Sequence, residues 1–185
     1  MAITTYTAGE VLTAASLNNN FASGGLQLVK TQVIGSAVGS VTVTGAFSST
    51  YDNYKIVISG GVGSAAGSNI GLQLGATATG YYWTGIYRQY TNTTVTADKA
   101  ENGSSWNYAG RSTTTSINLS VDLFGPNLAK NTNAIMFNTG AGTADYFFMT
   151  GGYLADTTQY TAFTLTPNTG TLTGGTIRVY GLANS

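Results

Sequence analysis

From residue 26 onward, apolar and polar positions alternate along the chain with a period of two. This period is typical of β-strands that bury one side and expose the other to solvent. The clearest segment is 116–123, where Ile117, Leu119, Val121 and Leu123 share one face. The same alternation predicts nine further strands, around 41–43, 54–58, 70–74 and 163–165 and over 26–34, 81–90, 134–138, 146–153 and 176–182.

Residues 26–185 are therefore predicted to form an all-β domain. About ten strands follow one another without an intervening helix, which excludes a parallel α/β sheet and favours antiparallel pairing. We expect a jelly-roll-like β-sandwich of about eight to ten strands, because ~155 residues exceed the ~100 of a seven-stranded immunoglobulin sandwich. Asn102-Gly103 is typical of a tight hairpin turn within this domain.

Residues 1–25 are predicted to form an N-terminal arm with one short helix. Thr13 can cap a helix that begins at residue 14, and Gly24-Gly25 stops it. Two turns of helix are not stable alone in water, so we expect the arm to dock on its own domain or on another protein. The apolar side chains expected to make these contacts are Ile3, Tyr6, Val11, Leu12, Leu17 and Phe21.

Composition removes several classes of function. The chain has seven basic and seven acidic side chains, no Cys and no His. Without Cys and His there is no thiolate chemistry and no imidazole base or metal ligand. Scattered basic residues cannot neutralise a run of phosphates, so we expect no nucleic-acid binding. No apolar run approaches the ~18 residues that a membrane-spanning helix needs.

The few charges also bear on assembly. A sandwich has edge strands, which monomers usually protect with Lys, Glu or Pro. Because such residues are scarce here, we expect neighbouring subunits to cover some edges, in preference to a stable monomer with short edges.

Catalytic residues, cofactors and metals are not predicted. The one catalytic option is a pair of carboxylates, as in glycosidases, and only Asp98 and Glu101 are close in sequence, within a predicted loop. Solvated loop acids are the favoured interpretation of the acidic residues, Asp145 among them. Residues 140–145 begin like a phosphate-binding loop, but they lie between strands and lack the final glycine.

The aromatic segment 81–90 has two interpretations. On a strand, Tyr81, Trp83 and Tyr87 share one face, while Arg88 lies on the other. Exposed rings would form a platform on which sugar rings stack, with Arg88 donating hydrogen bonds. Burial between sheets or against a neighbouring subunit is the interpretation we favour, since aromatic residues are enriched there. Trp106 and Tyr108 are expected nearby.

Three segments resemble structural proteins of tailed bacteriophages, including tail-fibre and head-surface proteins of phages of cyanobacteria and other aquatic bacteria. Residues 6–18 (YTAGEVLTAASLN) resemble the opening of many such proteins. Residues 51–59 (YDNYKIVIS) resemble an early strand, and residues 174–182 (GGTIRVYGL) the last strand, of their β-sandwich modules.

The resemblance implies that the arm tethers the chain to a virion, that the sandwich projects outward, and that the protein is a trimer. Fibres usually place a long shaft between anchor and head, whereas only Ser23-Gly24-Gly25 intervenes here. We therefore expect a non-enzymatic capsid decoration (cement) protein, made in the host cytoplasm and located on the virion exterior. Its partners would be its own copies and the major capsid protein or another virion protein. The alternative is a tail-fibre or receptor-binding module that recognises a host surface glycan.

Overall fold

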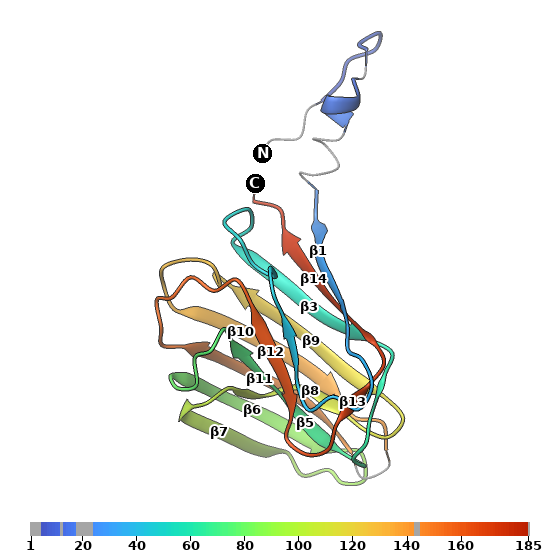
Figure 1. Cartoon of the computed structure of the whole chain (residues 1–185), viewed down its shortest axis with the longest axis vertical. Helices are drawn as coiled ribbons and strands as arrows, with labels where there is room; N and C mark the ends of the chain where they lie inside the picture. Colours follow the sequence, from blue (N-terminus) through green and yellow to red (C-terminus); the bar gives the residue numbers. More distant parts are fainter. Residues whose placement is uncertain (1–4, 12, 18–23, 143–144, 185) are drawn as a thin grey trace.

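The computed structural model describes residues 5–11, 13–17, 24–142 and 145–184, and these residues form an all-β domain preceded by an arm (Figure 1). Alternating burial runs along most of the strands, as in β10, where every second side chain is buried. The strands are β1 (Leu26–Val33), β2 (Val41–Val43), β3 (Asn53–Ser59), β4 (Val62–Gly63), β5 (Ser68–Leu74), β6 (Tyr81–Gln89), β7 (Thr96–Gly103), β8 (Trp106–Ser112), β9 (Ile117–Phe124), β10 (Thr132–Thr139), β11 (Tyr146–Leu154), β12 (Phe163–Pro167), β13 (Leu172–Thr173) and β14 (Thr176–Leu182).

Twelve strands form one hydrogen-bonded network, which divides at β9 into two sheets. Residues 117–119 of β9 pair with β8, whereas residues 120–124 pair with β3 on that edge and with β10 on the other. The larger sheet has the order β1-β14-β3-β9-β10-β11-β6-β7, and the smaller has the order β2-β12-β5-β8. All pairings are antiparallel, and β4 and β13 form a separate short ribbon.

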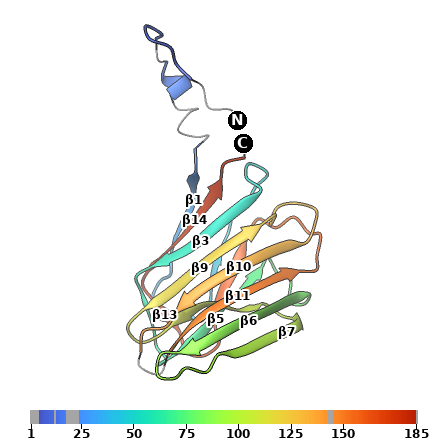
Figure 2. The ribbon, with the colours of Figure 1, turned by 180° about the vertical axis from the view of Figure 1, so that it is seen from behind.

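The hydrophobic core lies between the two sheets. In Figure 1, β2 and β12 cross in front of the larger sheet, and Figure 2 shows that sheet from behind. The larger sheet contributes Ile56, Val121 and Met136, and the smaller contributes Leu72 and Leu165, all fully buried. Burial of this apolar surface is the main favourable term in folding.

The antiparallel all-β architecture confirms the coarse prediction, and the described residues form fourteen strands where about eight to ten were expected. The ten predicted strands are present, and β4, β7, β8 and β13 were missed. In β7, the segment TADKAENG holds three charged residues and resembles a loop, but β7 is an edge strand whose charges face largely to solvent. Its Asp98, Lys99 and Glu101 protect this edge, in the way that charged residues protect the edge strands of monomers.

The predicted hairpin at Asn102-Gly103 is wrong. Strand β7 pairs with β6 in the larger sheet, whereas β8 pairs with β5 and β9, so the chain changes sheets between them. Asn102 has a φ of 55°, and its side-chain oxygen accepts a hydrogen bond from the Gly80 N–H at 2.8 Å. The left-handed conformation that favours Asn-Gly in hairpins therefore serves a sheet-switching corner here.

Candidate interaction surfaces

The N-terminal arm folds locally and lies beyond the end of the sandwich (Figure 1). Residues 14–17 form one helical turn. Thr13 caps it as predicted, because its Oγ1 accepts the Ser16 N–H at 3.1 Å and its carbonyl accepts the Leu17 N–H at 3.1 Å. Before it, the Thr7 N–H donates to Glu10 Oε2 at 3.0 Å. These hydrogen bonds all close within the arm.

Apolar arm side chains remain uncovered. Val11 is 82% exposed and Leu17 is 41% exposed, while Tyr6 is half-buried. Ile3, Leu12 and Phe21, also predicted to make contacts, lie outside the described residues. Val11 and Leu17 are therefore available for a contact with another chain.

The aromatic strand β6 alternates as predicted, but its inward face is buried. Tyr81 has no exposed surface and Trp83 has 6%. Their rings pack edge-on against Trp106 and Tyr108, with centroids 5.0 and 5.1 Å apart. A stacking platform for sugars needs exposed ring faces, which Tyr81 and Trp83 lack. Their burial agrees with the interpretation favoured from the sequence and not with the platform.

The other two residues predicted for this contact, Tyr87 and Arg88, do not lie beside Tyr81 and Trp83. Tyr87 is half-buried and stacks on Phe148 with centroids 5.0 Å apart. Arg88 is exposed on the opposite face, where its Nε donates to the Asn92 carbonyl at 2.9 Å. The four residues of the prediction therefore do not meet in one site.

Two tyrosine hydroxyls are held inside the domain. The Tyr81 hydroxyl accepts the Leu74 N–H at 2.7 Å, and burial raises the pKa of Tyr81. The Tyr108 hydroxyl donates to Asp98 Oδ2 at 2.6 Å. Burial and then the Asp98 carboxylate raise the pKa of Tyr108. Both phenols therefore stay neutral and act as structural hydrogen-bonding groups.

The one pair of acids that the sequence left open as a catalytic option does not face a common site. Asp98 and Glu101 lie in strand β7, not in a loop, and odd spacing places them on opposite faces. Asp98 faces Tyr108, whereas Glu101 contacts Lys99 on the solvent side. A glycosidase needs two carboxyls facing one substrate bond, so these two cannot supply that arrangement.

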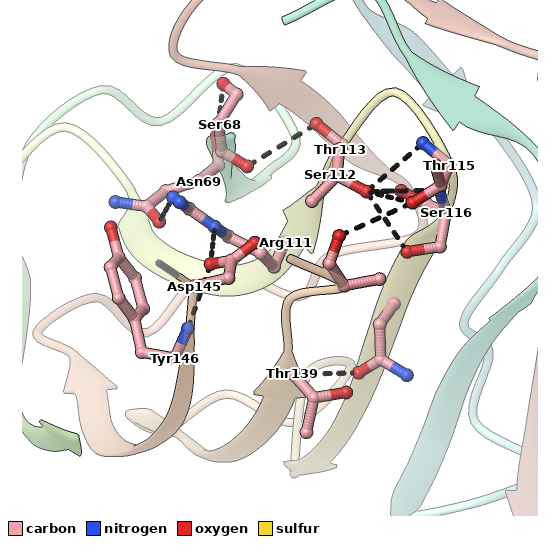
Figure 3. Close-up of polar contacts among 12 residues, drawn as sticks. Ser68, Asn69, Arg111, Ser112, Thr113, Thr115, Ser116, Thr139, Asp145 and Tyr146 are labelled. Atoms are coloured by element: carbon pink, nitrogen blue, oxygen red, sulfur yellow. Dashed lines mark hydrogen bonds and ion pairs between the residues drawn. The ribbon is translucent and has the colours of Figure 1, made fainter. Parts of the chain in front are cut away.

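A buried ion pair was missed by the sequence analysis (Figure 3). Arg111 Nε donates to Asp145 Oδ1 at 2.9 Å, and the side chains are only 9% and 4% exposed. The same guanidinium donates to Asn69 Oδ1 at 2.7 Å and lies 4.3 Å from the centroid of the Tyr146 ring. Asp145 Oδ1 also accepts the Tyr146 N–H at 3.0 Å. Asp145 is thus a buried structural residue and not the solvated loop acid that was expected.

A side-chain turn lies beside this ion pair (Figure 3). Thr113 Oγ1 accepts the Ser116 N–H at 3.1 Å in the loop that joins β8 to β9. The turn and the ion pair both fix β8 at the point where the two sheets divide, which indicates a role in architecture.

The larger sheet presents a second apolar surface on the side away from the core. We call it the outer apolar face, and it spans β9, β10, β11 and β6, which lie side by side in Figure 2. Its main side chains are each 38–44% exposed. They are Ile86, Phe124, Ile135, Phe137, Phe147 and Met149.

The outer apolar face has a hollow near its centre. The hollow lies over Gly151, whose missing side chain would meet nothing within 4 Å. Ile86, Ile135 and Met149 line it, and its volume is about 350 Å³.

A polar cleft of about 550 Å³ lies where the β7–β8 corner meets β5 and β12. This volume is within the range of small-molecule sites. Its lining is free of charged side chains and consists of Gly71, Gln73, Trp83, Ala100, Gly103, Ser104, Ser105, Asn107, Thr166, Pro167 and Asn168. Amide and hydroxyl groups beside an aromatic edge suit an uncharged, hydroxylated ligand better than an ion.

Within the described ranges, no group of three or more Asp or Glu residues is placed to hold a metal ion. The helical residues that the structure describes include no segment long and apolar enough to cross a membrane. Comparisons with protein-family models, curated proteins and solved structures find no match for this chain.

Proposed function

We propose that this chain is a non-enzymatic structural protein of a phage virion, attached to the outside of the head as a decoration (cement) protein. The observation that carries the proposal is the N-terminal arm, which lies outside the sandwich with Val11 and Leu17 uncovered. The resemblance of residues 6–18 to the openings of phage structural proteins assigns that arm to a virion surface. The same resemblance implies a trimer.

The strand order supports a jelly-roll module, an architecture found in viral capsid proteins. Eight strands serve as its framework, in chain order β1, β2, β3, β5, β8, β9, β12 and β14. They pair first with last and inward from there: β1 with β14, β2 with β12, β3 with β9, and β5 with β8. This is the pairing of a long hairpin rolled into two four-stranded sheets.

The remaining strands of the larger sheet are insertions into that framework. Strands β6 and β7 enter between β5 and β8, and β10 and β11 enter between β9 and β12. The insertions pair with each other through β6 and β11 and extend the larger sheet. The protein would therefore be a jelly roll with one widened sheet.

The proposed role is mechanical. A protein that binds the assembled shell and not its free subunits stabilises the shell by mass action. The arm inserts its apolar side chains between capsid subunits, and the sandwich adds further contact area. A standard interface buries about 1,600 Å², and many copies multiply that contribution.

Deletion of residues 1–21 tests the anchor. Heads assembled without this protein are mixed with full-length or truncated chain and sedimented, and the bound protein is measured. We expect the deletion to abolish binding and the double variant Val11→Asp/Leu17→Asp to weaken it at least tenfold. Thr5→Asp, which adds a charge at an exposed polar position of the same arm, should bind normally. Undiminished binding of the truncated chain refutes the anchor, and binding to tails alone refutes the head location.

The polar cleft favours a second candidate function, recognition of a host glycan by a tail-fibre module. Its neutral lining, with Gln73, Asn107 and Asn168 beside Trp83, suits the hydroxyl groups and apolar faces of a sugar. A glycan array tests it directly. Hits that disappear in Asn107→Ala would support glycan binding through the cleft, and an array without hits would exclude it for the glycans tested.

A further inference from the structure

The outer apolar face is unusual for an antiparallel sheet. Such a sheet commonly has one face in the core and one solvated polar face. Here the outward positions of β10 include Ile135 and Phe137, between the polar Asn133 and Thr139, and those of β11 include Phe147 and Met149. Their inward neighbours are buried as well, so segments 134–137 and 146–149 are apolar or aromatic throughout. Continuous apolar strands are typical of sheets that are covered on both sides.

The apolar side chains are continuous across the strands. In the antiparallel register, Phe137 is opposite Met149, and Met149 is opposite Ile86. Ile135 is opposite Gly151 in the same pair of strands. Directly opposite side chains on one sheet face are in contact distance, so these residues form one patch and are not scattered.

The size of the patch matches half of a homomeric interface. Large apolar side chains bury about 150–250 Å² each, so six that are about two-fifths exposed offer on the order of 500 Å². One side of a standard interface buries about 800 Å², and about 65% of it is apolar in homodimers, which is also on the order of 500 Å². The area therefore suffices for a specific contact between copies.

The shape of the patch suits a partner of the same kind. Face-to-face sheets pack about 10 Å apart, with side chains of each sheet between those of the other. The hollow over Gly151 is apolar and accepts a large apolar side chain. Phe137 and Phe147 are such side chains, and this face itself presents them.

The patch carries few charges, and most of them are paired. On the β3 side, Lys55 Nζ lies 2.9 Å from Asp122 Oδ1. On the β7 side, Lys99 contacts Glu101. Arg88 of β6 is exposed on the same face and adds one positive charge beside the patch. The face therefore has no strong field of one sign, and a strongly charged partner would find little complementarity there.

We propose that the outer apolar face is the surface through which copies of this chain associate. This inference goes beyond the virion role, because it names the contact between copies and holds whether or not the arm binds a head. The occupant is a second copy of the full chain, packed on Ile135, Phe137, Met149 and Ile86.

Light scattering and sedimentation of the full-length chain test the proposal, over concentrations from about 1 to 100 μM. The wild type should have a mass of twice 19.1 kDa, because a face that packs on the same face of a second copy closes at two chains. Ile135→Asp should shift the mass to a single copy by raising the dissociation constant at least tenfold. Phe137→Thr is a milder variant, which keeps a residue with high β-propensity on the exposed side of β10. Val33→Asp, at an exposed apolar position of β1 outside the patch, is the matched control and should associate like the wild type.

Each result of these measurements either supports or overturns the proposal. A wild type of 19.1 kDa throughout that range overturns the proposal, as does association that persists in folded Ile135→Asp and Phe137→Thr chains. Circular dichroism and urea unfolding report whether the variants are folded. A wild type that stays a single copy but loses head binding in Ile135→Asp shows that a capsid partner covers the face instead. Because the arm is intact in all these variants, failure here is distinct from failure of the arm-deletion experiment.

Discussion

Arg111 and Asp145 form an ion pair at 2.9 Å between side chains that are less than one-tenth exposed, 34 residues apart in the sequence. Arg111 lies in β8 of the smaller sheet, and Asp145 immediately precedes β11 of the larger sheet. The pair therefore joins the smaller sheet to strand β11 of the larger sheet. Asn69, from β5, holds the same guanidinium from the other side.

We expect Arg111→Met to destabilise the fold by about 3–5 kcal/mol, because it leaves the Asp145 carboxylate buried without its counter-charge. The double variant Arg111→Met/Asp145→Leu should lose less than Arg111→Met alone, since neither charge then remains. Urea unfolding measures both. Equal losses in the single and double variants would mean that the ion pair itself contributes nothing beyond packing.

Substitution by alanine should have different effects on stability at two adjacent glycines of β11. A Cβ on Gly152 would lie 2.3 Å from the Tyr82 carbonyl oxygen of the neighbouring strand, whereas one on Gly151 meets nothing within 4 Å. Gly152→Ala should therefore cost at least about 2 kcal/mol, through overpacking of β11 against β6. Gly151→Ala should leave stability unchanged or raise it by up to about 1 kcal/mol, because Ala restricts the unfolded chain. Thermal unfolding of both variants and the wild type, measured under the same conditions, tests these two predictions.

Stability should fall as the pH rises above the ordinary tyrosine pKa of 10.0. Burial raises the pKa of both Tyr81 and Tyr108, so the folded chain keeps protons that the unfolded chain loses. The resulting stabilisation is fully present below the unfolded pKa and is lost as the pH rises towards the folded value. Urea midpoints at about pH 8 and about pH 11 measure this loss. Tyr108→Phe should show a smaller loss than the wild type, and an identical loss would remove Tyr108 as a contributor.

Deletion of residues 1–21 should leave the stability of the sandwich within about 0.5 kcal/mol of the full-length value. The described hydrogen bonds of residues 5–17 close within that segment, from Thr7 to Glu10 and from Thr13 to Ser16 and Leu17. The hydrogen bond from the Ala183 N–H to the Gly25 carbonyl lies outside the deletion. Differential scanning calorimetry compares the two chains. A marked drop in the unfolding temperature would show that the arm packs on its own domain.

Local alternation was sufficient to predict ten strands and the two faces of β6, but not which face of a strand is buried. In β6 both faces carry aromatic side chains, so the pattern did not distinguish Tyr81 and Trp83, which are buried, from exposed rings. In β10 and β11 a signal was present: residues 134–137 and 146–149 are apolar or aromatic without a break, which indicates a covered outer face. We treated those segments as ordinary half-buried strands and missed the outer apolar face.

Contacts between residues that are far apart in the sequence, such as the buried ion pair, could not be predicted from local sequence patterns. Nothing near Arg111 or Asp145 in the sequence marks them as partners, because the pairing depends on how β8 and the start of β11 come together in the fold. Strand β7 was missed because its local signal was misleading. Its charges at 98, 99 and 101 resemble a loop, yet an edge strand with one solvated side tolerates them. Sequence patterns thus predict strands well where burial alternates, and poorly where it does not.

The pairing of Leu26 with Leu182 brings the start of the first strand and the end of the last strand to one corner of the sandwich. A force applied through the arm, with the body held at its far side, pulls β1 lengthwise against β14. The seven paired positions from Leu26–Leu182 to Val33–Thr176 then bear load together, and the strand slides as a unit. A force between the arm and the C-terminus instead peels the same positions apart one after another. Because forced unfolding follows the unfolding rate, the chain should resist the first pull far longer than the second.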